Sequence, residues 1–160
     1  MSYFENVKSR PIKEDAIILA IESSCDETAC AILQGRNCLL ASEIESSMTE
    51  HVRFGGVVPE IASRAHTTAV SIVVERALQK AGKTLKDIDA IAVTYGSGLL
   101  GALLVGVSYA KALAFALNIP LIPVSHIRPL ILRFAWMVRL LAAAVDVLKK
   151  MQNSKLLKMH

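Results

Sequence analysis

The chain has 160 residues, of which 53% are hydrophobic, and a formal net charge of +4. This length predicts one domain with a single core, and the small basic excess is compatible with an RNA partner without establishing one. Its odd set of cysteines, Cys25, Cys30 and Cys38, follows no leader-like segment, which argues against a secreted disulfide scaffold and favours the cytoplasm. Their spacing matches no zinc knuckle, even with His51 or His66 added.

The chain is organised around the stretch AIILAIESSCDETACAIL, in which two apolar segments flank a short polar one. Each apolar segment is too short for a helix, so the sequence predicts strands at 16–22 and 28–33 joined as a hairpin. The turn between them carries Ser24, Asp26 and Glu27. Hydroxyl, backbone N–H and carboxylate groups of this kind can hold a phosphate and its cation. The same residues are also ordinary turn formers, so the turn alone does not establish a ligand.

A turn at Gly35 leads to a third strand at 38–46, whose more frequent polar residues place it at or near the sheet edge. After a loop with two glycines, the sequence predicts a helix at 58–81, with Pro59 in its first turn and Gly82 just past its end. One face of this helix is apolar, which indicates packing on a sheet. That face comprises Ile61, Ala65, Ala69, Ile72, Val73 and Ala77.

His66 borders the apolar face of this helix, and Arg64 follows Glu60 by four residues. The ordinary interpretation is a packed histidine and an ion pair on the helix surface. A role in function stays open, because the glycine-rich loop brings His66 and Arg64 to one end of the helix, and paired glycines allow close backbone approach.

A fourth strand at 88–95 ends in a glycine turn that opens a helix at 98–118. Free N–H groups at a helix start, together with the helix dipole, form a general anion site, so Gly96 and Gly98 are candidate phosphate-binding residues. The turn lacks the Lys-Ser/Thr of a P-loop and the spacing of a dinucleotide fingerprint. A fifth, buried strand at 121–125 completes a strand, helix and strand crossover.

The second helix carries a stripe of small side chains, and it is long and apolar enough to raise the question of a membrane. In a soluble chain such a stripe lets another backbone approach closely, whereas in lipid it would pair helices. Asn118 and Pro120 end the helix and Lys111 lies in its middle, which favours a chain that does not enter a membrane. The stripe comprises Gly98, Ala102, Gly106, Ala110 and Ala114.

These elements predict an α/β fold: one domain at 16–126 with a mixed five-stranded sheet and helices on both faces. Residues 1–15 are expected to form a loose amino-terminal arm. Residues 127–160 are expected to form an atypical helical tail, where Phe134 and Trp136 are more typical of packing than of ligand contact.

Four motifs, IESSCDETACAIL, GGVVPEIASRAH, TYGSGLLGALLVG and PVSH, point to a family. In sequence and order they resemble the amino-terminal half of the tRNA threonylcarbamoyladenosine transferase family, formerly named O-sialoglycoprotein endopeptidases. The resemblance extends over residues 16–126. It implies half of an actin-like ATPase (ribonuclease H-like) fold, with nucleotide bound between two related domains. It also implies transfer of a threonylcarbamoyl group from its adenylate to the adenosine beside the tRNA anticodon.

The resemblance further implies site residues, cofactors and partners. The family holds a divalent metal, such as iron or zinc, through a His-x-x-x-His pair and a later aspartate. The implied site residues are Asp26 and Glu27 for catalysis, Ser24, Gly96 and Gly98 for nucleotide or threonylcarbamoyl-AMP, and His126 for the metal. The implied partners are tRNA and a paralogous subunit of the transfer complex.

The chain departs from the family's pattern around and after His126. Leu130 stands where the second metal-binding histidine is expected, Pro129 replaces the glycine before it, and Ser97 replaces the usual proline of the glycine turn. No motif of a second domain is recognisable, so the chain is expected to be inactive by itself. The alternatives are a non-catalytic module that pairs with a paralogue through its helices and small-residue stripe, and a membrane-anchored peptide indicated by hydropathy alone.

Overall fold

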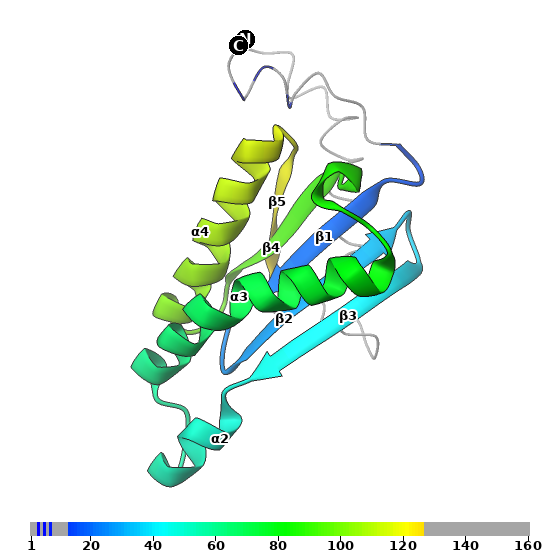
Figure 1. Cartoon of the computed structure of the whole chain (residues 1–160). Helices are drawn as coiled ribbons and strands as arrows, with labels where there is room; N and C mark the ends of the chain where they lie inside the picture. Colours follow the sequence, from blue (N-terminus) through cyan, green and yellow to red (C-terminus); the bar gives the residue numbers. More distant parts are fainter. Residues whose placement is uncertain (1–2, 4, 6, 8–12, 127–160) are drawn as a thin grey trace.

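The structure, a computed structural model, describes residues 3, 5, 7 and 13–126. Its centre is a five-stranded sheet in the order β3-β2-β1-β4-β5, with long helices beside it (Figure 1). The predicted strands are confirmed, with β1 in the middle of the sheet and β3 at one edge. The strands are β1 (Ile17–Glu22), β2 (Glu27–Gln34), β3 (Cys38–Ser46), β4 (Ala90–Gly96) and β5 (Leu121–Ser125).

The strand pairing confirms the predicted hairpin and the mixed sheet. Strand β1 pairs antiparallel with β2 and parallel with β4, β2 pairs antiparallel with β3, and β4 pairs parallel with β5. Gly35 closes the β2–β3 turn with a φ of 61°, as predicted. The carboxyl ends of β1, β3, β4 and β5 therefore meet the start of β2 at one edge of the sheet, called the carboxyl edge below.

Two long helices, α3 (Pro59–Ala81) and α4 (Leu100–Leu117), begin and end within two residues of the predicted positions. Short helical segments that the sequence analysis did not predict also occur: α2 (Met48–His51) and the 3₁₀ turns Val52–Phe54 and Leu85–Asp87. Helix α2 extends beyond the carboxyl edge (Figure 1). Gly82 ends α3 in the left-handed conformation, as a helix-closing glycine should.

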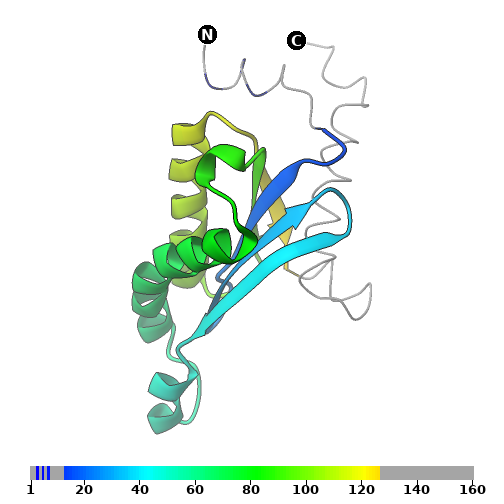
Figure 2. The same ribbon diagram turned by 45° about the vertical axis from the view of Figure 1, so that its right-hand side comes forward.

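Both long helices lie on the same face of the sheet (Figure 2). Within residues 13–126, long helices therefore cover one face of the sheet, whereas the sequence predicted helices on both faces. The helix expected in the tail lies outside the described residues. The second face carries a separate buried apolar cluster. Its members are Ile18, Ala20, Ala31, Leu33, Ala90, Ala92, Ile122 and Val124.

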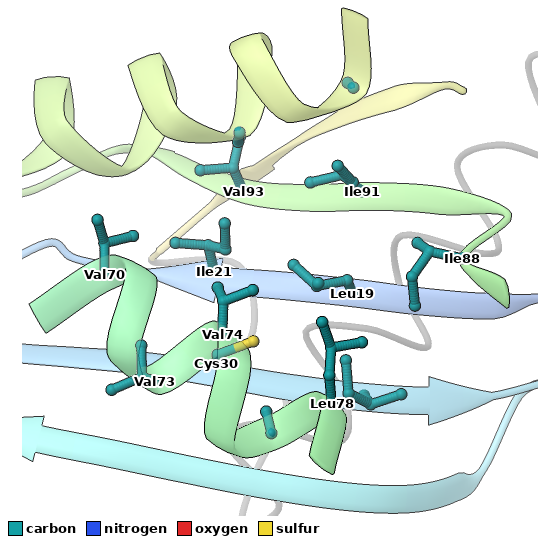
Figure 3. Close-up of a cluster of buried hydrophobic side chains, with 14 of the residues drawn as sticks. Leu19, Ile21, Cys30, Val70, Val73, Val74, Leu78, Ile88, Ile91 and Val93 are labelled. Atoms are coloured by element: carbon teal, nitrogen blue, oxygen red, sulfur yellow. The ribbon is translucent and has the colours of Figure 1, made fainter. Parts of the chain in front are cut away.

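The main core fills the space between the sheet and the two helices (Figure 3). Leu19, Ile21 and Ile91 from the strands share this core with Val73 and Val74 of α3, and all are nearly or fully buried. Each such side chain contributes roughly 1.5–3 kcal/mol through burial. The core thereby fixes the helices against the face that ends at the carboxyl edge.

The buried face of α3 is rotated from the predicted one. Ile72, expected on that face, is 39% exposed, whereas His66 is 1% exposed. The apolar pattern predicted the wrong face because apolar residues such as Ile72 also lie on the flank of the helix. His66 can be buried because both of its ring nitrogens form hydrogen bonds. The predicted ion pair between Arg64 and Glu60 is confirmed at 2.7 Å on the exposed surface.

The small-residue stripe of α4 packs inside this chain. Ala102, Gly106 and Ala110 are buried, and a Cβ added to Gly106 would collide with the side chain of Ser23, which directly follows β1. The part of the stripe from Ala102 to Ala114 is therefore not available to a partner, contrary to the expectation that the stripe favours pairing. By length and composition α4 is also capable of crossing a membrane, with a mean hydropathy of 1.8 over its 18 residues.

The expected amino-terminal arm lies mostly outside the described residues, as does the whole tail. Within the arm, the Tyr3 hydroxyl donates a hydrogen bond to the Ile119 carbonyl at 2.8 Å. The Tyr3 ring also packs against Phe115 with 5.6 Å between ring centroids. Burial raises the pKa of Tyr3, so this hydroxyl stays a donor at neutral pH. At this point the arm contacts the end of α4.

Candidate functional site

Buried polar side chains gather at the carboxyl edge, in a domain whose interior is otherwise apolar. Within residues 13–126, every buried side-chain nitrogen and oxygen has a hydrogen-bond partner. Satisfied networks of this kind hold side chains rigidly, because an unpaired buried polar group would be costly. The buried polar residues are Glu22, Ser23, Ser24, Thr28, Ser47, His51, His66 and Thr94.

Glu22 connects three strands at this edge. One carboxylate oxygen accepts the backbone N–H of Ser24 at 2.6 Å, and the other accepts the hydroxyl proton of Thr94 at 2.5 Å. His126, just beyond β5, places Nδ1 3.1 Å from the Ser24 hydroxyl and 3.4 Å from the Glu22 carboxylate. Sequence reasoning missed Glu22 and Thr94, although a carboxylate that ends an otherwise apolar strand was a usable signal.

The glycine turn, which contains Gly96 and Gly98, packs directly on the turn between β1 and β2 that contains Ser24, named the serine turn. The backbone N–H of Leu99 donates to the Ser24 carbonyl at 2.8 Å, and the N–H of His126 donates to the Gly96 carbonyl at 2.5 Å. A Cβ on Gly98 would lie closer than 3.0 Å to the Ser24 backbone, so this position requires glycine for packing alone. Ser24, Gly96, Gly98 and His126, predicted separately, thus form one cluster.

The two predicted catalytic carboxylates follow Ser24 in the sequence, Asp26 in the same turn and Glu27 at the start of β2. Asp26 is half-buried and lines a cavity of about 290 Å³ between the hairpin and α3. Glu27 was assigned to the turn, but it is the first residue of β2 and pairs with Ser46. The ion pair between Arg76 and Glu45, 2.8 Å long, forms another wall of the cavity. The structure therefore places Asp26 two residues after Ser24, at the cavity beside α3, and Glu27 in the strand that follows.

Cys25 gives a chemical test of where the Asp26 carboxylate lies. Burial raises the pKa of the Cys25 thiol, and a hydrogen bond and the negative charge from Asp26 raise it further. A raised thiol pKa lowers the thiolate fraction at neutral pH, so Asp26→Asn is expected to speed iodoacetamide alkylation of Cys25 by about threefold. Mass spectrometry of labelled peptides over time would measure this rate.

Two other cysteines and one neighbouring carboxylate serve as controls for the alkylation experiment. Cys38 is exposed and its rate should not change, whereas burial raises the pKa of Cys30, which should stay unlabelled. Glu27→Gln should have a smaller effect, because Glu27 is the weakest of the causes that raise the Cys25 pKa. Equal rates in Asp26→Asn and the unmodified chain would contradict the placement of the Asp26 side chain.

The described residues do not make a complete metal site. Residues 13–126 contain no group of three or more histidine, cysteine, aspartate or glutamate side chains placed to hold a metal ion. His126 offers one imidazole, and Leu130, outside the described residues, has no lone pair to donate. A site with its geometry fixed needs more ligands than this, so the described residues do not hold a metal ion by themselves.

Comparisons with known proteins place the chain among relatives of one named family. A family model described as tRNA N6-adenosine threonylcarbamoyltransferase matches residues 38–146. Proteins of that name from Clostridium kluyveri and Bacillus subtilis are 60% and 56% identical over 114 and 115 residues. These matches cover 71% and 72% of this chain and 33% of each relative, so the chain spans about a third of their length.

The fold also resembles that of a solved structure. YeaZ from Pseudomonas aeruginosa superposes with a TM-score of 0.54 at 28% sequence identity. The match covers 69% of this chain and 44% of that protein. The likeness supports the predicted half of an actin-like fold.

Proposed function

Because the chain belongs to the tRNA N6-adenosine threonylcarbamoyltransferase family, we propose that its carboxyl edge forms one wall of a threonylcarbamoyl-transfer site. The observation that carries this proposal is the buried polar network that joins the Ser24 turn, the glycine turn and His126. The substrates are threonylcarbamoyl-AMP and tRNA, and the place of action is the cytoplasm. The basic net charge of +4 favours contact with the RNA backbone.

In the proposed reaction the N6 amine of adenosine attacks the carbamoyl carbon of the adenylate. The bond from that carbon to the phosphate oxygen breaks, AMP leaves with the electron pair, and the amine loses a proton. Ser24 and the N–H groups of the glycine turn at Gly96 and Gly98 bind the phosphate, since N–H groups at a helix start favour anions. Asp26 is the base that accepts the proton, a role worth roughly 10²–10⁴-fold in rate, with Glu27 as a second carboxylate of the catalytic pair. His126 is proposed as a single metal ligand.

A chimaera tests the proposal. Residues 16–126 joined to the remaining two thirds of the Bacillus subtilis relative are expected to transfer threonylcarbamoyl to tRNA, because the two sequences are 56% identical in the shared region. In that chimaera, Asp26→Asn is expected to lower kcat/KM at least about 100-fold, the range of a lost general base. Nucleoside analysis of the tRNA, with the adenylate donor and partner proteins supplied, measures the product.

Two controls accompany the chimaera. Asp15→Asn makes the same change at an exposed position before β1, at the opposite end of the sheet, and should leave kcat/KM unchanged. The 160-residue chain by itself should give no product above the no-enzyme background. Turnover by the chain alone that is lost in His126→Ala, or an active Asp26→Asn chimaera, would contradict the proposal.

A second candidate function is pairing with a paralogous subunit of similar fold. Its support is an exposed apolar surface on α3 and α4, together with the likeness to YeaZ. Leu104 and Phe115 of α4 are 55% and 70% exposed. Beside Leu104 lies a groove of about 430 Å³ between the helices, lined by Thr67, Val70, Leu104, Val105, Ser108 and Tyr109.

Charging the groove should abolish such pairing. Leu104→Asp is expected to weaken binding of a paralogous subunit at least about 100-fold, since a charge at the centre of an apolar interface is left unpaired. Size-exclusion chromatography of the mixed proteins measures complex formation. Leu39→Asp makes the matched change on the edge strand β3, at a residue that is 40% exposed, and should not affect it. Co-elution of the Leu104 variant would exclude this surface.

A further inference from the structure

Two histidines at the carboxyl edge are not used by the proposed reaction. His51 ends helix α2 and is 3% exposed, and His66 lies in the first half of α3 and is 1% exposed. Their role is not apolar packing alone, because both ring nitrogens of each histidine have hydrogen-bond partners. Both sets of hydrogen bonds lead to the backbone next to Asp26.

His66 holds the turn directly. Its Nε2 lies 3.0 Å from the carbonyl oxygen of Cys25, and its Nδ1 lies 2.6 Å from the Thr28 hydroxyl. A carbonyl can only accept, so the Nε2 proton of His66 points at Cys25. In the neutral ring Nδ1 then accepts the proton of the Thr28 hydroxyl. One ring thus spans the turn from its middle to the start of β2.

His51 reaches the next carbonyl through one serine. The backbone N–H of Val58 donates to its Nδ1 at 3.3 Å, so the ring proton is on Nε2. Nε2 donates to the Ser47 hydroxyl at 3.0 Å, and that hydroxyl donates to the Asp26 carbonyl at 2.8 Å. The backbone N–H of Ser47 donates to the same carbonyl at 3.0 Å. The donor and the acceptor of each hydrogen bond from Val58 through His51 and Ser47 to Asp26 are therefore determined.

We propose that His51 and His66 are positioning residues, which lock the two peptide groups on either side of Asp26. The Cys25 carbonyl belongs to the peptide before Asp26 and the Asp26 carbonyl to the peptide after it. Fixing both planes fixes φ and ψ of Asp26, and with them the direction of its Cα–Cβ bond. The importance of this direction for transfer rests on the proposed function; the locking of the turn does not.

The ring tautomers test the hydrogen-bond directions in the unmodified chain. Nitrogen-15 NMR of the imidazoles should show both His51 and His66 as the Nε2–H tautomer at neutral pH, with slow exchange of the Nε2 protons. A ring that averages between tautomers, or that carries its proton on Nδ1 alone, would overturn the proposal for that histidine. This measurement needs no substitution and no activity.

Substitutions of His66 separate its two hydrogen bonds. A glutamine amide reaches the place of Nε2 and an asparagine amide the place of Nδ1, so His66→Gln keeps the Cys25 contact and His66→Asn keeps the Thr28 contact. Amide hydrogen exchange at Asp26 and Glu27 should quicken by about tenfold in His66→Asn, the effect of losing one buried hydrogen bond. It should stay within about threefold of the unmodified chain in His66→Gln.

A matched control and a kinetic measurement complete the experiment. Thr67→Ala changes the neighbouring exposed residue of α3 and should leave the turn amides unaffected. In the active chimaera, His66→Asn should lower kcat with little change in KM, and His66→Gln should restore kcat. Equal rates of amide hydrogen exchange at Asp26 and Glu27 in His66→Gln and His66→Asn would overturn the proposal. If a variant does not fold, the nitrogen-15 NMR measurement of the tautomers in the unmodified chain decides the proposal. An inactive chimaera with normal turn exchange would count against the proposed function alone.

Discussion

Replacing Gly98 with alanine is expected to lower the free energy of unfolding by about 3 kcal/mol, at the upper end of overpacking costs. The added Cβ would lie closer than 3.0 Å to the carbonyl oxygen, Cα and Cβ of Ser24. Most of these atoms belong to the backbone, and Ser24 is further tied to Glu22 and to Leu99. The serine turn therefore cannot move aside cheaply, and the glycine turn must separate from it.

Urea unfolding of the two glycine variants of this turn measures the effect. Gly96→Ala is the matched control, because a Cβ at Gly96 has no atom within 4 Å and its φ is not positive. We expect that variant to lie within about 1 kcal/mol of the unmodified chain. Equal midpoints for Gly98→Ala and Gly96→Ala would show that the two turns are not packed as described.

The strands and long helices were predictable because their signals are local. Apolar runs of strand length, the glycine at Gly35 and the proline at Pro59 mark their ends unambiguously. The short helix α2 was missed, since four residues carry no periodicity. The hydrogen bonds that connect His51 through Ser47 to the Asp26 carbonyl were missed with it. The rotation of α3 was missed because Ile72 and its apolar neighbours suit a helix flank as well as a core.

The candidate site was predictable residue by residue but not as a network. Ser24 and Gly98 were each chosen from their own turns, and only the parallel pairing of β1 with β4 brings them into contact. The same pairing brings the ends of these strands together, so that Glu22 meets Thr94. No local pattern reports a hydrogen bond between residues 72 positions apart in the sequence. For that reason Glu22, which no motif argument selected, carries the second large prediction.

Replacing Glu22 with alanine is expected to destabilise the chain by about 3 kcal/mol or more. The Ser24 N–H and the Thr94 hydroxyl would both lose their acceptor while Ser24 and Thr94 remain buried, at roughly 1–3 kcal/mol for each unsatisfied group. Glu75→Ala on the exposed side of α3 is the control and should change stability by less than about 0.5 kcal/mol. Urea unfolding measures both variants.

A double substitution distinguishes an unsatisfied network from a simple cavity. In Glu22→Leu combined with Thr94→Val, both partners of one hydrogen bond become apolar, so the Thr94 position no longer carries an unpaired hydroxyl. The double variant should therefore lose about 1–2 kcal/mol less than the sum of the two single variants, because removing both partners avoids part of the desolvation penalty. Additive losses would mean that the hydrogen bond between Glu22 and Thr94 contributes no coupling energy. Coupling of that size would instead show that the hydrogen bond between Glu22 and Thr94 ties the ends of β1 and β4 together at the carboxyl edge.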